Sequence, residues 1–316
     1  MDDLMYFSYF KSNFEIKSTQ GGRFKDKTKG FLACFLTFFV LFSVQTSFAA
    51  SPVWKVAKAG HYFYLGGTIH LLSKQDYPLP SGFQVAYDDS EALVLEIDLG
   101  KTTGAGFQQN LISLMSYPAG ERLQHHLSKE MYLKLTEHFR QNGQNIEKFN
   151  RFKAGYISML LTVFELQKLK LAGTGVDQYF FKLAEKDHKM IVGLEGLSEH
   201  FSAIANMGVG YEDKLLAHSL GELDELTLQL ERMKQAWKKG DLKEFDKLSI
   251  AEMREEFPTL YHDILVKRNQ AWLPKIASLV NANKTSLVLV GNAHLAGEDG
   301  LIHQLKLKGF TLKQLL

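Results

Sequence analysis

Residues 286–294 read SLVLVGNAH, a short apolar run that passes through glycine and ends on His294. Residues 61–70 read HYFYLGGTIH and repeat the arrangement, ending on His70. Short apolar runs bounded by glycine are typical of strands. Glycine three residues before each histidine lets the chain turn off the strand. We therefore expect both imidazoles to lie at the ends of strands.

Two further apolar runs end on an acid. Residues 92–99 (ALVLEIDL) carry Glu96 and residues 189–195 (KMIVGLE) end on Glu195. Both runs predict buried core strands. A carboxylate at the end of a buried strand is costly unless a cation, a metal or hydrogen bonds compensate it. The two glutamates are therefore candidate site residues.

The other segments predict the fold class. Strands are expected at Val53–Ala57 and Thr311–Leu315, and helical patterns separate most of the strands. Strands that alternate with helices predict an α/β protein with a mixed, largely parallel central sheet flanked by helices. A large helical insertion is expected between Lys101 and Lys189. The expected helices are 81–90, 128–140, 154–171, 176–186, 213–239, 242–257, 259–280 and 299–308.

The strand ends define a candidate metal site. Parallel sheets bind their ligands beyond the carboxyl ends of the strands. Two neutral imidazoles with one or two carboxylates suit a divalent transition metal such as zinc, manganese or cobalt. Each of these residues alone is more often structural, so the prediction depends on their joint position.

Composition excludes one class of partner. The chain is 45% apolar and 23% charged, as in ordinary globular proteins. Beyond residue 49, Lys and Arg equal Asp and Glu at 31 each. A neutral body without a basic stripe does not favour nucleic acid.

The first 49 residues predict a signal peptide. Lysines at 25, 27 and 29 precede the apolar run 31–44, and small residues follow. We expect cleavage after Ala49, or secondarily after Ala50, and a single domain over residues 50–316 in the periplasm. An uncleaved membrane anchor is the alternative. The sole cysteine, Cys34, lies in this leader, so the mature chain has no disulfide.

Five segments, taken in order, resemble the TraB/GumN family, which includes the Tiki metalloproteases. They are YLGGTIHLL, VLEIDL, GVDQYFFKLAEKDHKMIVGLE, LVKRNQAW and VLVGNAHLAGEDGLIHQLKLKGF. The resemblance spans about residues 53–316. It implies an α/β fold shared with erythromycin-esterase-like and ChaN-like proteins. The family pattern has Thr and then Gln after the third strand's acid, whereas this chain continues GLSEH.

The resemblance also implies site residues. His70, Glu96 and His294 are the implied metal or catalytic residues. Glu195, Arg268 and Asn269 are implied beside them.

We hypothesise a metal-dependent hydrolase, in which a peptide bond is one candidate target. His70, Glu96 and His294 would hold the metal and Glu195 would be the general base. Arg268 and Asn269 would orient a substrate carbonyl or stabilise its charge. Exchanging the roles of the two glutamates fits the sequence equally well.

Two alternatives remain. One is a periplasmic binding or accessory protein linked to envelope polysaccharide, as the GumN name suggests. The other is metal-free hydrolysis by a His/Glu arrangement like that of the erythromycin esterases. A peptide or small molecule is the expected substrate, and the membrane is contacted only through an uncleaved leader.

Overall fold

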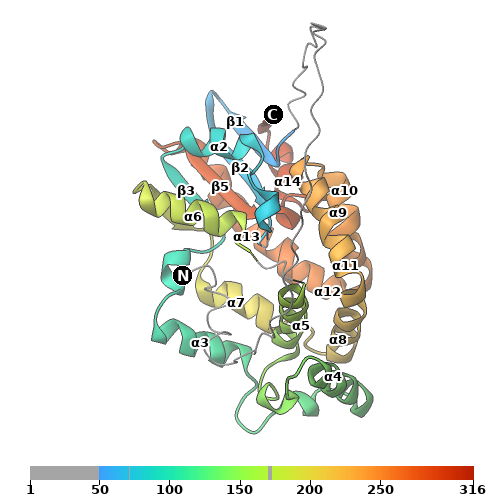
Figure 1. Ribbon diagram of the computed structural model, residues 1–316. Helices are drawn as coiled ribbons and strands as arrows, with labels where there is room; N and C mark the ends of the chain where they lie inside the picture. The colour runs from blue at the N-terminus through green and yellow to red at the C-terminus, as the bar shows by residue number, and fades with distance from the viewer. Residues whose placement is uncertain (1–49, 71, 170–172) are drawn as a thin grey trace, which may run out of the picture. The chain divides into compact units, whose positions relative to one another are not determined.

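The computed structural model of the chain describes residues 50–70, 72–169 and 173–316. Figure 1 shows how their helices and strands are arranged. The predicted signal peptide and Cys34 lie outside the described residues. All six residues that the sequence assigns to the site are described.

Six strands form one sheet in the order β4-β3-β5-β2-β1-β6. The four strands from β4 to β2 are parallel, whereas β1 is antiparallel to both β2 and β6. The predicted mixed, largely parallel sheet of an α/β protein is thus confirmed. The strands are β1 (Val53–Lys58), β2 (His61–Thr68), β3 (Ala92–Leu95), β4 (Met190–Gly193), β5 (Ser286–Gly291) and β6 (Thr311–Gln314).

Helices cover both faces of the sheet. Neighbouring residues of a central strand point to opposite faces, so each strand contributes side chains to both layers. Leu93 and Leu287 pack into one apolar core with α2, α6 and α9. Val94 and Val288 pack into a second core with α13 and α14. Burial on both faces explains why β3 and β5 are apolar throughout. These helices are α2 (Ser81–Asp88), α6 (Val176–Lys186), α9 (Leu226–Lys238), α13 (Lys267–Ser278) and α14 (Leu301–Leu307).

The predicted helical insertion is present, and Figure 1 shows it beyond one end of the sheet. Two of its helices, α3 and α5, pack against α7, and α5 also packs against α8; α7 and α8 follow β4 and lie outside the predicted bounds 101–189. The chain enters α7 soon after β4, so the insertion lies next to the strand ends. The helices within the predicted bounds are α3 (Ala105–Met115), α4 (Lys129–Gln141), α5 (Ala154–Lys168) and α6, and the helices that follow β4 are α7 (Leu197–Ala205) and α8 (Glu212–Gly221).

Two strands differ from the prediction. β4 is not a core strand: it lies at the sheet edge, where Met190 and Val192 are exposed. β3 ends at Leu95 and does not continue to residue 99. Beyond its end, Asp98 accepts a hydrogen bond from the backbone N–H of Gly100, which turns the chain into a 3-10 helix.

The three long helices predicted in the C-terminal half are each interrupted. The stretch 213–239 contains a 3-10 turn between α8 and α9, next to the weak helix former Gly221. The stretch 242–257 divides into α10 (Leu242–Ser249) and α11 (Ala251–Glu256). Between α12 (Pro258–Tyr261) and α13, residues His262–Val266 form a π-helix turn. Such turns occur often at functional sites.

Candidate functional site

Four parallel strands end at one edge of the sheet, and each is followed by an ionisable side chain. Leu95 of β3 pairs with Gly193 of β4 and Leu289 of β5, and Thr68 of β2 pairs with Gly291 of β5. This register aligns the strand ends. The side chains that follow are, across the sheet, Glu195, Glu96, His294 and His70.

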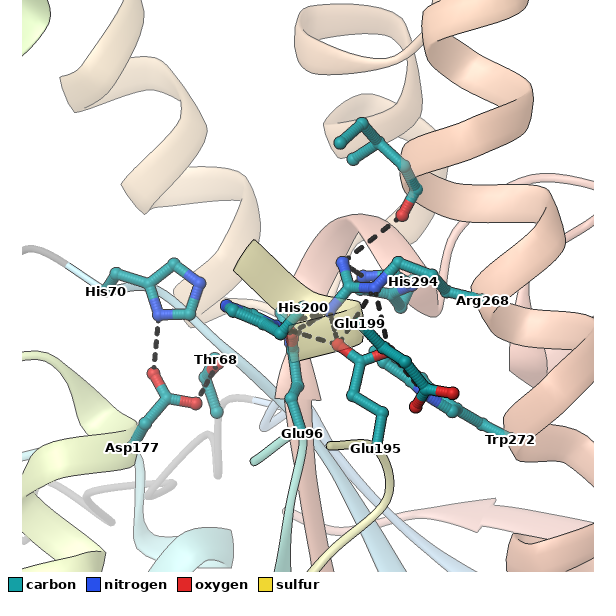
Figure 2. A network of polar contacts seen from close by, with 12 residues as sticks. Thr68, His70, Glu96, Asp177, Glu195, Glu199, His200, Arg268, Trp272 and His294 are labelled. Atoms are coloured by element: carbon teal, nitrogen blue, oxygen red, sulfur yellow. Dashed lines mark hydrogen bonds and ion pairs between the residues drawn. The ribbon is translucent and has the colours of Figure 1, made fainter. Parts of the chain in front are cut away.

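Arg268 of α13 joins most of these residues into one network (Figure 2). Its Nη2 donates to Glu96 Oε2 and Glu195 Oε1, each at 2.6 Å. Its Nη1 donates to His294 Nε2 at 3.0 Å, and Nη2 lies 3.0 Å from His200 Nδ1. The structure therefore brings Glu96, Glu195 and His294 together around Arg268.

Glu96 is a buried carboxylate whose two oxygens have different partners. Oε1 accepts the backbone N–H of Gly291 at 2.7 Å, and Oε2 accepts from Arg268. Burial alone would raise the pKa of this carboxyl, but His294 and Arg268 hold the pKa of Glu96 well below its usual range. Glu96 is thus a permanent anion near neutral pH.

Glu195 is saturated with donors. Besides Arg268, His200 donates from Nδ1 to Oε1 at 2.8 Å, and the indole of Trp272 donates to Oε2 at 3.1 Å. Burial raises the pKa of Glu195, but the hydrogen bonds from His200 and Arg268 outweigh it and lower the pKa overall. His200 thus carries a proton on Nδ1, and its Nε2 makes no hydrogen bond to another described residue.

The hydrogen bonds of His294 determine its tautomer. The amide N–H groups of Asn269 donate to the carbonyls of His294 and Asp299, so Asn269 Oδ1 accepts from His294 Nδ1 at 2.8 Å. Nε2 must then accept, because its partner Arg268 can only donate. Burial lowers the pKa of His294 to about 4, which keeps the ring neutral at pH 7.

His70 lies beside this network, and its ring is held by Asp177 of α6 (Figure 2). Its Nδ1 is 2.9 Å from Asp177 Oδ2, and Thr68 donates to Oδ1 of the same carboxylate at 2.7 Å. The His70 side chain is 68% exposed. The Asp177 charge raises the pKa of His70 to about 9, so His70 is protonated at neutral pH.

Gly291 locates the three predicted metal ligands relative to one another. A Cβ atom built on this glycine would lie 3.2 Å from Glu96 Oε1, 3.7 Å from His294 Cδ2 and 3.9 Å from His70 Nε2. All three side chains therefore border the same small region above the end of β5.

The glycines of the two Gly-x-x-His segments allow neighbouring groups to pack closely. They do not adopt a left-handed backbone conformation. Neither Gly67 nor Gly291 has a positive φ. A Cβ on Gly67 would collide with the side-chain amide of Asn292. That amide is buried, and neither of its polar atoms has a hydrogen-bond partner. Glycine is thus needed because the first segment packs directly on the second.

The loop around His70 is tied to α9. The indole of Trp237 donates to the carbonyl of Gly67 at 2.7 Å. Further along, buried Asp76 accepts from Lys234 at 3.0 Å and from Lys238 at 2.8 Å. These contacts hold the segment that carries His70 against the rest of the fold.

The π-helix turn ends two residues before Arg268 and helps to orient it. Arg268 Nη1 donates to the carbonyl of Ile264 in that turn at 3.3 Å. The guanidinium carbon also lies 4.5 Å from the ring centre of Trp272, one turn further along α13. Arg268 is therefore fixed from two sides of its own helix.

Two groups of ligand atoms among the described residues have metal-binding spacing: His218, Glu222 and Glu252 outside this network, and a second group within it. Atoms of Glu96, Glu195 and His200 lie within 4.8 Å of one another. The predicted set differs from this group, since it joins Glu96 to His70 and His294. His294 Nε2 is 4.0 Å from Glu96 Oε1.

Asp177, His200 and Trp272 were missed by the sequence-based prediction. Asp177 stands in the first turn of a helix directly after glycine, and His200 follows Glu195 by five residues in GLSEH. An imidazole one turn into the helix after a strand-end acid is a usable signal. Nothing local marks Trp272, which also packs on the His294 ring at 4.5 Å between centres.

Fold and site together define an α/β protein with a His/Glu/Arg cluster at the carboxyl edge of a parallel sheet. The chain belongs to the TraB/PrgY/gumN family, whose model matches residues 52–314. It is 26% identical over 280 residues to the uncharacterized protein YbaP of Escherichia coli (strain K12), covering 84% of this chain and 99% of YbaP. The same protein of Shigella flexneri is 25% identical with the same coverage. No solved structure matches the chain.

Proposed function

We propose that this chain is a hydrolase with a divalent metal held by His70, Glu96 and His294. The observation that carries the proposal is the shared orientation of the two histidines. Asp177 holds Nδ1 of His70 and Asn269 holds Nδ1 of His294, so Nε2 is the nitrogen that each ring can offer to a metal. Metal-binding histidines are usually oriented in this way through their other nitrogen.

The donor groups fit a metal on two conditions. Glu96 Oε1 and His294 Nε2 are 4.0 Å apart, which allows both to reach one ion at about 2.0–2.2 Å. His294 Nε2, however, accepts from Arg268. Metal binding therefore requires Arg268 to give up this hydrogen bond. The proton on His70 must also leave, so metal affinity should rise with pH.

A bound ion would supply Lewis acidity, which acidifies water and polarises a carbonyl. We assign the proton transfer to His200 instead of Glu195. Both oxygens of Glu195 already accept hydrogen bonds, and its pKa is lowered, so it is a weak base. Glu195 instead orients His200 for proton transfer through Nε2.

In this proposal Arg268 and Asn269 hold other groups of the site in position. Both amide hydrogens of Asn269 are used by backbone carbonyls, which leaves none for a substrate. Arg268 keeps two buried carboxylates ionised and close together. The substrate class stays a peptide or small molecule, with no expectation of nucleic acid.

Metal-free hydrolysis is a second candidate, and the position of Arg268 favours it. Its guanidinium already supplies a cation to Glu96 and Glu195. The His70–Asp177 pair would then activate water through His70 Nε2, in the manner of a base oriented by a carboxylate. Because protonated His70 is inactive as a base, this activity would rise with pH up to about 9.

A panel of peptides and small esters tests the proposal. Cleavage should disappear in chelator and return with Zn²⁺, Mn²⁺ or Co²⁺, and His200→Gln should lose it. His126→Ala is the matched control, because His126 pairs with Glu121 at 2.9 Å outside both groups of possible metal ligands. Cleavage that persists in chelator supports the metal-free candidate. No cleavage under any condition contradicts both, and leaves a binding or accessory protein as the better account.

We also propose that the chain is exported and processed after Ala49. The N–H of fully buried Ser51 donates to the carbonyl of Leu315 at 2.9 Å. Cleavage before Ala50 keeps this bond and leaves the new ammonium group on a partly exposed residue. In the described part of the chain, no helix is long and apolar enough to cross a bilayer. Mass spectrometry of exported protein should find Ala50 first; an intact leader in the membrane fraction would favour the anchor.

A further inference from the structure

Arg268 occupies the position that a cation would take among the acidic and imidazole groups. One atom, Nη2, contacts Glu96 and Glu195 at 2.6 Å and lies 3.0 Å from His200. These are the residues whose ligand atoms have metal-binding spacing. The other terminal nitrogen contacts His294. A divalent ion and this guanidinium therefore cannot both use the same donor atoms.

The cluster is closed to solvent, so its charges depend on one another. Side-chain exposure is 7% for Glu96, 7% for Glu195 and 12% for Arg268. Two buried carboxylates this close together need a counter-charge to remain ionised. In this arrangement Arg268 supplies it.

We infer that Arg268 is an internal counter-cation that competes with divalent metal for Glu96 and His294 and so sets the metal affinity of the site. The inference deepens the proposed function, on whose metal ligands it rests. It also implies a latent second ligand set, formed by Glu96, Glu195 and His200, that can bind metal only once Arg268 leaves it and His200 Nδ1 gives up its proton.

The neighbourhood of Arg268 offers it few contacts outside the cluster. On its own helix it donates to the carbonyl of Ile264 and stacks over Trp272. Both contacts are made with residues that are not proposed metal ligands, so they need not break when Arg268 releases His294. Release of the Nη1–His294 bond alone frees the first ligand atom.

Removal of Arg268 tests the inference through metal binding. Purified wild type, Arg268→Ala and the control Arg254→Ala are stripped with chelator and titrated with Zn²⁺ by calorimetry. Arg254 also pairs with a carboxylate, Asp246 at 2.9 Å, but lies outside the cluster. We expect Arg268→Ala to bind Zn²⁺ at least about tenfold more tightly than wild type, since the freed carboxylates gain a new counter-charge. Arg254→Ala should match wild type.

Equal or weaker Zn²⁺ binding by Arg268→Ala overturns the inference, because it would mean that Arg268 supports the metal site. If the stripped variant does not fold, refolding on addition of Zn²⁺ supports the inference. If it folds under neither condition, Arg268→Lys decides the matter. A lysine presents one nitrogen where arginine uses several, so Zn²⁺ should bind it more tightly than wild type; equal or weaker binding contradicts the inference.

The two proposals fail in different ways. Zn²⁺ binding by Arg268→Ala but not by wild type would support the counter-cation role and contradict metal dependence of the native site. Zn²⁺ binding of equal strength by both would keep the proposed metal site and remove the competition.

Discussion

Asp177 and Asn269 each hold one ring nitrogen of a site histidine, and their effects on these rings can be measured directly. In chelator, the wild-type His70 ring should titrate near pH 9 by NMR. Asp177→Asn removes the charge that raises this pKa, so the ring should titrate closer to the ordinary value of about 6.5. Thr68→Val is the control, because it removes a hydrogen bond to Asp177 but leaves the charge. A wild-type pKa near 6.5 would contradict the pairing.

The same substitution should change how stability depends on pH. Because folding raises the pKa of His70, protonation of this ring stabilises the fold fully below about pH 6.5, and the stabilisation is lost as pH rises through about 9. Chemical denaturation of wild type should therefore show a loss of stability over that interval. Asp177→Asn should show a smaller loss.

Asn269→Ala should weaken metal binding without removing a ligand. The amide orients His294 through Nδ1 and satisfies two backbone carbonyls. Loss of an orienting partner typically lowers metal affinity by about 10–100-fold. The orphaned carbonyls should also cost about 1–3 kcal/mol in unfolding free energy. Unchanged Zn²⁺ affinity by calorimetry would show that Asn269 is structural only.

At the scale of residues, the sequence predicted those site groups that follow strands directly. His70, Glu96, Glu195 and His294 stand at the ends of apolar runs, and parallel strands bring their ends together. Asp177 could not be found in this way, because it reaches His70 from a helix 107 positions away. Such a contact depends on tertiary packing and leaves no periodic signal.

Among the elements, the contact between the two Gly-x-x-His segments yields a stability prediction. Gly67→Ala places a methyl group against the Asn292 amide and should cost about 1–3 kcal/mol in unfolding free energy. Adding Asn292→Ala should restore most of the loss, since the amide makes no hydrogen bond in the described structure. Gly106→Ala on α3, where the added atom meets nothing within 4 Å, should be neutral or slightly stabilising. A neutral Gly67→Ala would contradict the packing.

Element boundaries were predicted well where capping and composition change sharply. The helix Val176–Lys186 matches its prediction at both ends. The π-helix turn before Arg268 was not foreseen, because residues 259–280 keep a helical apolar pattern through it. Nor did the apolar sequence of β4 reveal an edge strand, since its exposure depends on which strands flank it.

At the scale of the whole molecule, the order of strands and helices was enough to predict an α/β fold with a largely parallel sheet. The resemblance of five ordered segments identified the family that the comparison confirms over residues 52–314. Chemistry is less accessible from sequence. Arg268 contacts both Glu96 and His294 because α13 brings it to the strand ends. The order of residues in the sequence does not reveal this packing.

The metal content of the chain tests the central claim most directly. Wild type, His70→Ala, His294→Ala and the control His126→Ala, whose histidine lies in neither group of possible metal ligands, are purified without chelator, loaded with Zn²⁺, desalted and measured by elemental analysis. We predict about one ion per chain in wild type and His126→Ala, and a loss of bound ion in both site variants, which should remain folded. A folded His70→Ala/His294→Ala double variant that retains the wild-type metal content would contradict the proposed metal site.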